Sequence, residues 1–205
     1  MPAHPNAAFS FGAVILAAGR SVRMGQPKLL LPWGQTSVLG HALNQWRHLG
    51  AAQVAVVCAE DDSGIEGELR RLGFPQQNRI FNPDPARGMF SSIQCAAGWP
   101  SWPTTVTHWA IALGDQPHLR AATLRATLAL AVSHPEQVCQ PAYGGRPRHP
   151  VILPRTVFLK LRDSTVTDLK AFLGQFPVSL CEISDPGLNL DIDRPEDYVN
   201  ALRLL

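Results

Sequence analysis

Short, continuous apolar runs recur along the first half of the chain. Residues 13–18 (AVILAA) and 53–59 (QVAVVCA) contain almost no polar position, and residues 107–117 (THWAIALGDQP) form a run that ends in a polar turn. Residues 79–83 (RIFNP) form a shorter run. Apolar runs of this length without alternation are typical of strands that are covered on both faces. The four segments are therefore predicted to be strands of a buried sheet.

Between these runs the apolar positions follow a helical period. In residues 37–50 they fall on one stripe, Ser37 stands where it can cap the first turn, and Gly50 stands where the last turn can end. Three further stretches are predicted to be helices: 63–73, 89–99 and 121–134. Strands that alternate with helices over short links favour a mostly parallel, twisted sheet with helices on both faces. The pattern predicts an α/β chain with a Rossmann-like, three-layer α/β/α architecture.

The alternation changes after Glu136. Residues 137–154 are predicted to form two strands around a loop rich in glycine, arginine and proline. The remaining predicted elements are helices over 155–163, 165–176 and 194–205 and strands over 178–183 and 188–192. No linker-like composition divides the chain, so residues 1–205 are interpreted as one domain, with residues 1–10 as a loose N-terminal tail.

Composition narrows the classes of protein to consider. The 205 residues are 45% hydrophobic, which fits one fairly large domain. A net charge of +2 is far below that of a nucleic-acid-binding domain. No segment approaches the ~20 apolar residues of a membrane span. The four cysteines and seven histidines show no metal-binding or redox spacing. We expect a soluble cytoplasmic protein whose partners include neither nucleic acid nor a membrane.

The first candidate site follows the first predicted strand. Ala17, Ala18 and Gly19 are small enough for their backbone N–H groups to approach an oxyanion closely. The next nine residues contain three cations suited to phosphate groups: Arg20, Arg23 and Lys28. The stretch matches neither the P-loop nor the dinucleotide-binding pattern. On these residues alone, an ordinary surface turn with solvated cations explains it equally well.

Carboxylates form the second candidate feature. Asp115 ends a predicted strand, and ligands of open α/β sheets bind at the carboxyl ends of strands. Its oxygen atoms suit Mg²⁺, although an Asx turn is the simpler explanation. Asp191 and Asp193 are two positions apart, so on a strand both would point to one side. Such a pair repels itself unless a cation or solvent relieves the charge.

Two loops offer further polar groups. Asn82 and Ser92 flank Gly88, where a helix start can bind an anion or a polar ligand edge, although simple helix capping by Ser91 or Ser92 is an equal alternative. A second loop, the basic loop, contains a glycine pair at residues 144–145 and three candidate side chains: Arg146, Arg148 and His149. This loop can hold a second anionic substrate or be a solvated hairpin tip.

Five segments, taken together, resemble the signatures of nucleotidyltransferases of the molybdenum-cofactor type. LAAGRSVRMGQPK resembles their LAAGxSxRMGxxK signature, and GDQP resembles their metal-binding motif. GMFSSIQ, RPRHPVIL and LDIDRPEDY resemble their GMxxSL, GHPVLF and DIDTPEDY segments. The matches follow the family order and span residues 14–198. The LAAG form is more similar to the cytidylyltransferases of this family than to the guanylyltransferases, which usually carry LAGG.

The resemblance implies a nucleotidyltransferase fold and a reaction in which the phosphate of molybdopterin attacks the α-phosphate of CTP. The products are the cytosine dinucleotide cofactor and pyrophosphate. The residues assigned to catalysis are Lys28, Arg23 and Asp115. The residues assigned to the nucleotide are Leu16, Ala17, Ala18, Gly19, Arg20, Ser21, Lys28, Asn82 and Ser92. Mg²⁺, with Mn²⁺ as an alternative, is assigned to Asp115 and Asp193, with Asp191 as second choice. The residues assigned to the acceptor are His149, Arg146 and Arg148.

The sequence departs from the family pattern at two positions. Arg148 stands where glycine is usual before His149, which bears on the acceptor, and Arg194 stands where threonine is common. Transfer from another nucleotide such as GTP, or to another small phosphate, is the first alternative. An oxidoreductase relative and a chaperone that delivers the cofactor to a molybdoenzyme client are further alternatives.

Overall fold

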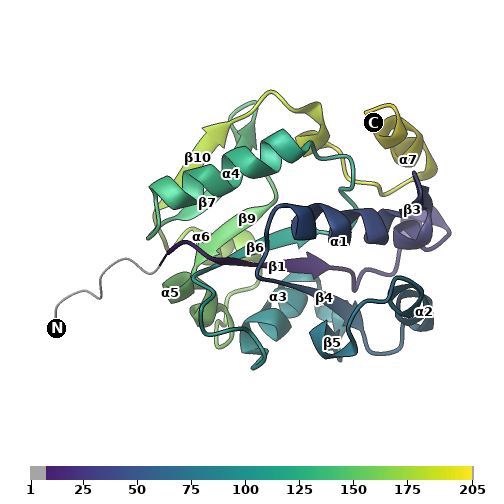
Figure 1. Ribbon diagram of the computed structural model, residues 1–205, viewed down its shortest axis with the longest axis horizontal. Coiled ribbons are helices and arrows are strands. Elements are labelled where there is room, and N and C mark those ends of the chain that lie inside the picture. The colour runs from purple at the N-terminus through teal and green to yellow at the C-terminus, as the bar shows by residue number, and fades with distance from the viewer. Residues whose placement is uncertain (1–7, 205) are drawn as a thin grey trace.

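An eight-stranded sheet forms the centre of the computed structural model, which describes residues 8–204 (Figure 1). The strands follow one another across the sheet in the order β10-β7-β9-β6-β1-β4-β5, and β8 pairs with β7. Their bounds are Phe11–Leu16 (β1), Gln53–Ala59 (β4), Arg79–Asn82 (β5), His108–Leu113 (β6), Val138–Tyr143 (β7), Arg146–Pro147 (β8), Val151–Pro154 (β9) and Val178–Glu182 (β10). A separate two-stranded sheet joins β2 (Pro32–Trp33) to β3 (Thr36–Ser37).

The predicted mostly parallel sheet is confirmed. β1 runs parallel to both β4 and β6, and β4 is parallel to β5. Of the seven strands in the main path, β9 is antiparallel to its neighbours β6 and β7. Leu16, the last residue of β1, pairs with Val57 on one side and Leu113 on the other. The carboxyl ends of β1 and β6 therefore lie side by side.

Helices cover both faces of the sheet, as predicted (Figure 1). On one face lie α1 (Val38–His48), α2 (Ser63–Arg71), α4 (Ala121–Ser133) and α7 (Pro195–Leu202). On the other lie α3 (Met89–Gly98), α5 (Arg155–Phe158) and α6 (Leu169–Leu173).

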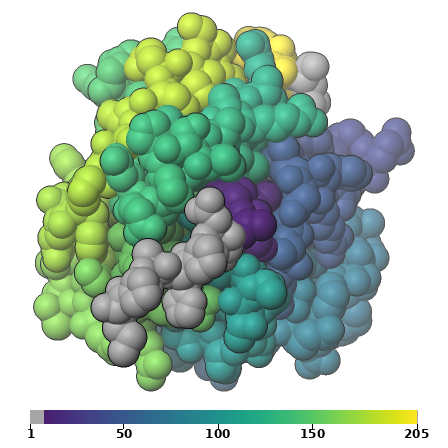
Figure 2. Space-filling model, turned by 60° about the vertical axis from the view of Figure 1, so that its left-hand side comes forward, coloured from purple at the N-terminus to yellow at the C-terminus, as the bar shows by residue number. Residues whose placement is uncertain are grey.

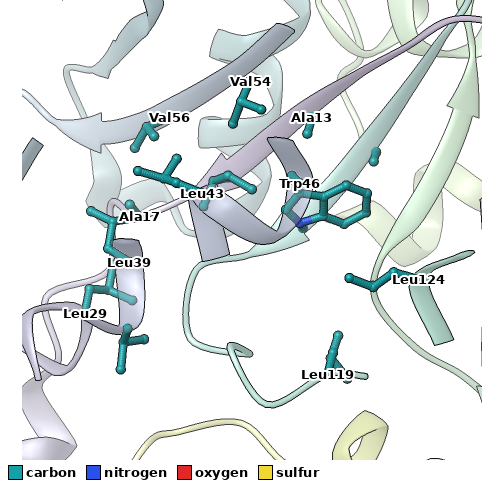
Figure 3. Packing of buried hydrophobic residues seen from close by; sticks show 14 of the residues in the cluster. Ala13, Ala17, Leu29, Leu39, Leu43, Trp46, Val54, Val56, Leu119 and Leu124 are labelled. Atoms are coloured by element: carbon teal, nitrogen blue, oxygen red, sulfur yellow. The ribbon is translucent and has the colours of Figure 1, made fainter. Parts of the chain in front are cut away.

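The apolar stripe of α1 explains how the first core forms. Leu39, Leu43 and Trp46 pack against strand residues that include Ala13 and Val54 (Figure 3). Burying each large side chain contributes about 1.5–3 kcal/mol. The Ser37 hydroxyl accepts a hydrogen bond from Gly40 N at 3.0 Å and caps the helix, as predicted. Gly50 has a φ of 85°, which suits the predicted end of the helix.

The second core lies under α3, α5 and α6. Ile93 and Ala96 of α3 are fully buried there, and the Phe158 ring stacks on Trp109 with 4.3 Å between ring centroids. Packing on both faces explains why the central strands carry uninterrupted apolar runs.

The strand predicted over residues 188–192 is wrong. Pro186–Asn189 forms a 3₁₀ helix, η6, and residues 190–194 have no strand partner. Asp185 and Pro186 favour this local turn, because the Asp185 carboxylate accepts a hydrogen bond from Gly187 N at 3.0 Å. Asp191 and Asp193 therefore do not share the face of a strand.

Several predicted boundaries also change. β1 ends at Leu16, so Ala17 and Ala18 belong to the loop that follows it. The helix predicted over 155–163 is α5 followed by a 3₁₀ turn, and the one predicted over 165–176 is reduced to α6, which Asp168 caps. β-branched residues before Asp168 and the capping carboxylate explain the late start.

β1 is almost completely buried, and the small purple area in Figure 2 marks the beginning of the described chain. Of the predicted N-terminal tail, residues 1–7 lie outside the described residues, whereas Ser10 is held by a 3.1 Å hydrogen bond from its N–H to the Thr107 hydroxyl. Within residues 8–204, no helix has the length and apolar character needed to cross a membrane.

Candidate active site

The carboxyl ends of β1 and β6 meet at a glycine that no other residue can replace without movement. Gly114 N donates a hydrogen bond to the carbonyl oxygen of Leu16 at 3.0 Å. A Cβ atom at Gly114 would lie only 2.8 Å from that oxygen, so a side chain there would force the two strand ends apart. The close approach brings Asp115, the next residue, beside the loop that begins at Ala17.

That loop presents backbone donors. The Ala17 N–H donates to the carbonyl of Val57 at 2.8 Å, so, contrary to the prediction for Ala17, it is not free to meet an oxyanion. The N–H groups of the next four positions have no acceptor among the described residues. Ser21 has a φ of 50° although it is not glycine, a strained conformation of the kind that clusters at ligand sites. Its hydroxyl accepts a 3.3 Å hydrogen bond from Lys28 N.

Four charged side chains converge beside the loop. The Lys28 Nζ atom lies 2.5 Å from Asp115 Oδ2 and 2.9 Å from Asp193 Oδ1. Arg23 Nη2 lies 2.7 Å from the other oxygen of Asp193. The tertiary structure thus joins residues from three distant parts of the chain into one cluster of two cations and two carboxylates.

The cluster favours the charged forms of Lys28 and Asp193. Burial by itself would lower the pKa of Lys28, but the nearby carboxylates of Asp115 and Asp193 outweigh it, and the pKa of Lys28 is raised. Burial likewise disfavours the charge on Asp193, but Lys28 and Arg23 outweigh it, and the pKa of Asp193 is lowered.

Arg20 does not join this cluster. Its guanidinium points to Asp61, 3.7 Å away, and both side chains are largely exposed. An exposed pair of this kind has little energetic weight, so Arg20 remains free to reorient toward a ligand.

Asp115 and Asp193 fit a divalent cation in donor type and charge. Both carboxylates surround one point, which the Lys28 ammonium occupies, and hard divalent ions prefer such oxygen donors. Within residues 8–204, however, no group of three or more His, Cys, Asp or Glu side chains is arranged to hold a metal. The three predicted metal aspartates therefore do not form a single cluster.

Asp191 lies apart from Lys28. Its Oδ1 accepts a 2.8 Å hydrogen bond from Gln116 Nε2. Partial burial, with the neighbouring charge of Asp115, raises the pKa of Asp191. The two late aspartates thus have opposite surroundings, one paired with cations and the other facing an amide.

An open cavity of about 280 Å³ lies between the loop and the start of α3. Lys28, Asp115 and Ser92 are among its walls, together with Gly88, whose φ of 90° favours glycine. The other lining residues are Leu16, Ala17, Ala18, Gly19, Leu29, Pro85, Met89 and Leu113. Of the residues assigned to the nucleotide, Arg20, Ser21 and Asn82 do not line this cavity.

Asn82 supports the cavity wall from behind. It is 2% exposed, and its Oδ1 accepts from Asp84 N at 3.0 Å, which fixes the orientation of the amide. Its Nδ2 group therefore donates to the hydroxyls of Ser91 and Ser92, each at 2.9 Å. Gly88, without a side-chain cap, precedes α3, so the capping role considered for the two serines is wrong.

The basic loop borders two further cavities. Arg146, Arg148 and His149 line one of about 730 Å³, whose floor is mainly apolar and reaches α6 and β10. Arg148 and His149 also line one of about 270 Å³ that contains Gln116 and Asp191. Leu113 lines both this smaller cavity and the cavity beside Lys28, so the two adjoin.

His149 is a neutral acceptor. Its Nδ1 lies 3.3 Å from the carbonyl oxygen of Ile111, so Nδ1 carries the hydrogen and Nε2 is left as an acceptor. Burial lowers the pKa of His149 and keeps the ring uncharged. Arg148 donates through Nη2 to Asn189 Oδ1 and so connects the basic loop to η6.

Three residues at the site carry no role that the sequence alone predicted. Gln116, His118 and Asn189 contact the segment around Asp191 or the basic loop. Gln116 and His118 closely follow Asp115, and this adjacency was the signal that could have found them. Their partners lie about 70 positions away, so their contacts appear only in the folded chain.

Residues 13–177 match the model of the MobA-like NTP transferase domain. The chain belongs to this family. This MobA-like protein is therefore a nucleotidyltransferase, as predicted, and its fold is that of this enzyme class.

Curated relatives cover almost the whole MobA-like chain. The molybdenum cofactor cytidylyltransferase of Escherichia coli (strain K12) is 28% identical over 92% of this chain and 93% of its own. The molybdenum cofactor guanylyltransferase of Rhizobium johnstonii is 32% identical over 94% of this chain and 91% of its own.

Solved structures are similar over the same extent. Rv0371c from Mycobacterium tuberculosis H37Rv superposes with a TM-score of 0.76 and 28% identity, covering 96% of this chain and 99% of that one. A structure of Rv0371c in complex with manganese superposes with a TM-score of 0.71 and 26% identity over the same shares of both chains.

Proposed function

We propose that this MobA-like protein transfers CMP from CTP to the phosphate of molybdopterin, with formation of the cytosine dinucleotide cofactor and release of pyrophosphate. The observation that carries the proposal is the cluster of Lys28, Asp115 and Asp193. This cluster lies where the cavity of about 280 Å³, beside the loop after β1, adjoins the cavity of about 270 Å³ that His149 lines. Such a junction suits two anionic substrates that react with each other.

In this proposal the triphosphate binds along the loop after β1. The N–H groups of residues 18–21 form a nest for phosphate oxygens, and Arg23 and Lys28 supply positive charge. Arg20 turns from its weak contact with Asp61 to join them. Lys28 exchanges its carboxylate partners for a phosphate, a move for which a flexible ammonium is suited.

The base lies against α3. Because Ser92 accepts a hydrogen bond from Asn82, its hydroxyl hydrogen remains available to donate into the cavity. Cytosine offers the acceptors O2 and N3 to such a donor. A cavity of about 280 Å³ is at the small end for ligand sites, which favours a pyrimidine over a purine.

Asp115 and Asp193 would hold a divalent metal ion, Mg²⁺ or Mn²⁺. When bound, such an ion neutralises charge that develops on the phosphoryl oxygens. Arg23 remains on the outer oxygen of Asp193 and holds that carboxylate in place. The similar protein Rv0371c forms a complex with manganese, which supports a divalent metal ion as the cofactor of this protein.

The chemical step needs no general base. A phosphate oxygen of the acceptor, ionised at neutral pH, forms a bond to the α-phosphorus of CTP, and the bond from that phosphorus to the α–β bridging oxygen breaks. Pyrophosphate leaves with the electron pair. Lys28 and the loop N–H groups stabilise the charge of this transition state, so their contribution is positioning and electrostatics.

The acceptor would occupy the cavities beside the basic loop. Neutral His149 accepts a hydrogen bond through Nε2, Arg148 and Arg146 supply cations, and Asp191 accepts from N–H groups of the pterin. Asp191 is thus reassigned from the metal to the acceptor. We further propose a cytoplasmic location and a molybdoenzyme client that receives the product.

A nucleotide panel tests the proposal. Pyrophosphate release is measured with CTP, GTP, ATP and UTP in the presence of molybdenum-loaded molybdopterin, and CTP is expected to be used fastest. Guanylyl transfer is the second candidate, because a guanylyltransferase is among the similar proteins, at 32% identity. Faster reaction with GTP than with CTP would favour guanylyl transfer over cytidylyl transfer. Absence of transfer to molybdopterin, with transfer to another phosphate acceptor, would refute both.

A further inference from the structure

His118 links two segments that are far apart in the sequence. It lies three residues after Asp115, is 5% exposed, and places Nε2 3.0 Å from the carbonyl oxygens of both Gly187 and Leu190. Both partners are acceptors, so Nε2 carries the hydrogen and shares it between them. Burial lowers the pKa of His118 and favours this neutral form.

The segment that His118 holds has no strand to position it. Residues 190–194 make no ladder contacts, and η6 before them is a single short turn. What anchors the segment is the burial of Leu188 and Ile192, the contact of Asp185 with the Thr123 hydroxyl at 2.5 Å, and the His118 bonds. The loop of Asp115 supplies two of the side-chain contacts to this segment: the His118 bonds to the backbone, and the 2.8 Å hydrogen bond from Gln116 to the Asp191 side chain.

The backbone at Gly187 is shaped for this contact. A Cβ atom there would lie 3.0 Å from Cδ2 of the His118 ring. Gly187 is itself buried, so the ring has no solvent-filled space into which it can retreat. A side chain at position 187 would therefore push against the imidazole ring, and it would also lie 3.1 Å from Asp185 Oδ1.

We propose that His118 is a positioning residue that sets the distance between Asp115 and the segment carrying Asp191 and Asp193. Through this link, the two carboxylates assigned to the metal are held on opposite sides of one point before any ligand arrives. The proposal rests on the proposed metal role of Asp115 and Asp193. It adds that the buried imidazole, which touches neither substrate nor metal, determines how well that pair binds a divalent ion.

The test compares His118→Leu with His118→Gln. Leucine has no donor, whereas the glutamine amide has two N–H groups that can serve the two carbonyls. The measurement is Mn²⁺ affinity in the presence of CTP, read from the EPR signal of free Mn²⁺. His118→Leu is expected to weaken Mn²⁺ binding by on the order of 10- to 100-fold, as for other residues that orient metal ligands. His118→Gln is expected to bind Mn²⁺ with an affinity much closer to that of the wild type.

His108 provides a matched control. It is also 5% exposed, and its Nε2 lies 3.0 Å from the carbonyl of Pro135, but it begins β6 rather than following it. His108→Leu removes a buried imidazole of the same kind at the other end of the strand. It is expected to lower Tm while leaving Mn²⁺ affinity at the wild-type value.

Gly187→Ala disturbs the same contact from the glycine side, and it replaces His118→Leu in the test if that variant does not fold. It is expected to weaken Mn²⁺ binding, and metal-free CTP binding, measured by equilibrium dialysis, should be unchanged in all variants. Wild-type Mn²⁺ affinity in both His118→Leu and Gly187→Ala would overturn the proposal, as would an equal loss in His108→Leu. The assay needs only bound nucleotide, so a wild-type protein that binds Mn²⁺ and CTP but transfers no CMP to molybdopterin would refute the proposed function alone.

Discussion

At the scale of single residues, the site depends on one ammonium group held between two carboxylates. Lys28 contacts Asp115 and Asp193 at 2.5 and 2.9 Å, and its side chain is 13% exposed. The two carboxylates stabilise the partly buried ammonium charge. The flexible lysine side chain can also leave them to contact a phosphate. The signature that contains Lys28 and the two candidate aspartates are readable in the sequence, whereas their pairing with Lys28 is not, because they lie 87 and 165 positions away.

Lys28→Ala should reduce turnover by on the order of 10²-fold or more, since it removes a donor to charge that develops in the transition state. Steady-state pyrophosphate release measures the effect. Lys160→Ala, which removes an exposed lysine that lies over the Phe176 ring, is the control and should retain the wild-type rate. A near-normal rate for Lys28→Ala would remove this residue from the catalytic assignment.

Asp193 should make stability depend on pH in the acid range. Its pKa is lowered in the folded chain, where Lys28 and Arg23 outweigh burial, so the unfolded chain binds the proton more readily. The stabilisation is therefore fully present above the ordinary carboxyl value, near 4, and is lost as the pH falls through the folded value. Urea unfolding of wild type and Asp193→Asn between pH 7 and 3 should give curves that converge on acidification. Parallel curves would show that the ion pairs contribute nothing.

At the scale of elements, the site forms because β1 and β6 end together. The parallel pairing of Leu16 with Leu113 is followed by the Gly114 contact, and both are consequences of strand order rather than of local sequence. Apolar runs and amphipathic stripes predicted these strands and their helices. The segment over 188–192 was predicted incorrectly because alternating Leu, Asp and Ile residues mimic a strand, while side-chain contacts with His118 and Gln116 hold it as an irregular chain.

Gly114→Ala should destabilise the fold by about 1–3 kcal/mol, because the added Cβ has no room beside the Leu16 carbonyl. Gly67→Ala is the matched control. Gly67 lies on the exposed surface of α2, and a Cβ atom added there would meet no other atom within 4 Å, so alanine should stabilise the helix by about 0.5–1 kcal/mol. Urea midpoints measure both changes. Equal midpoints for wild type and Gly114→Ala would mean that the strand ends can separate freely.

At the scale of the whole molecule, three adjoining cavities line the edge of the sheet where β1 and β6 end. One lies beside Lys28, and two are shared by Arg148 and His149. The α/β class was predicted from the alternation of strands and helices, the family was predicted from five ordered motifs, and both are confirmed. The sequence assigned residues to a nucleotide and to an acceptor, but it did not show that their cavities adjoin, because each cavity is lined by several segments that are distant in the sequence.

Ligand binding to the whole folded chain should be visible as thermal stabilisation. At a concentration 100 times its Kd, CTP with Mn²⁺ should add about 2.7 kcal/mol, or on the order of 5–10 °C in Tm for a chain of this size. GTP at the same concentration should add less, because the cavity against α3 favours a pyrimidine. Differential scanning fluorimetry makes the comparison, and a larger shift with GTP would reverse the assigned base preference.

The sequence by itself determined most of the elements, the family and the position of the loop proposed to bind phosphate, because hydrophobic period, capping residues and short motifs act over neighbouring positions. The tertiary structure decided which carboxylates meet Lys28, that Asp191 faces Gln116, and that Arg20 turns toward Asp61. It also revealed that His118, together with Gln116, links the two acidic segments. These contacts join positions far apart in the chain, and their geometry depends on strand order and on the packing of buried side chains.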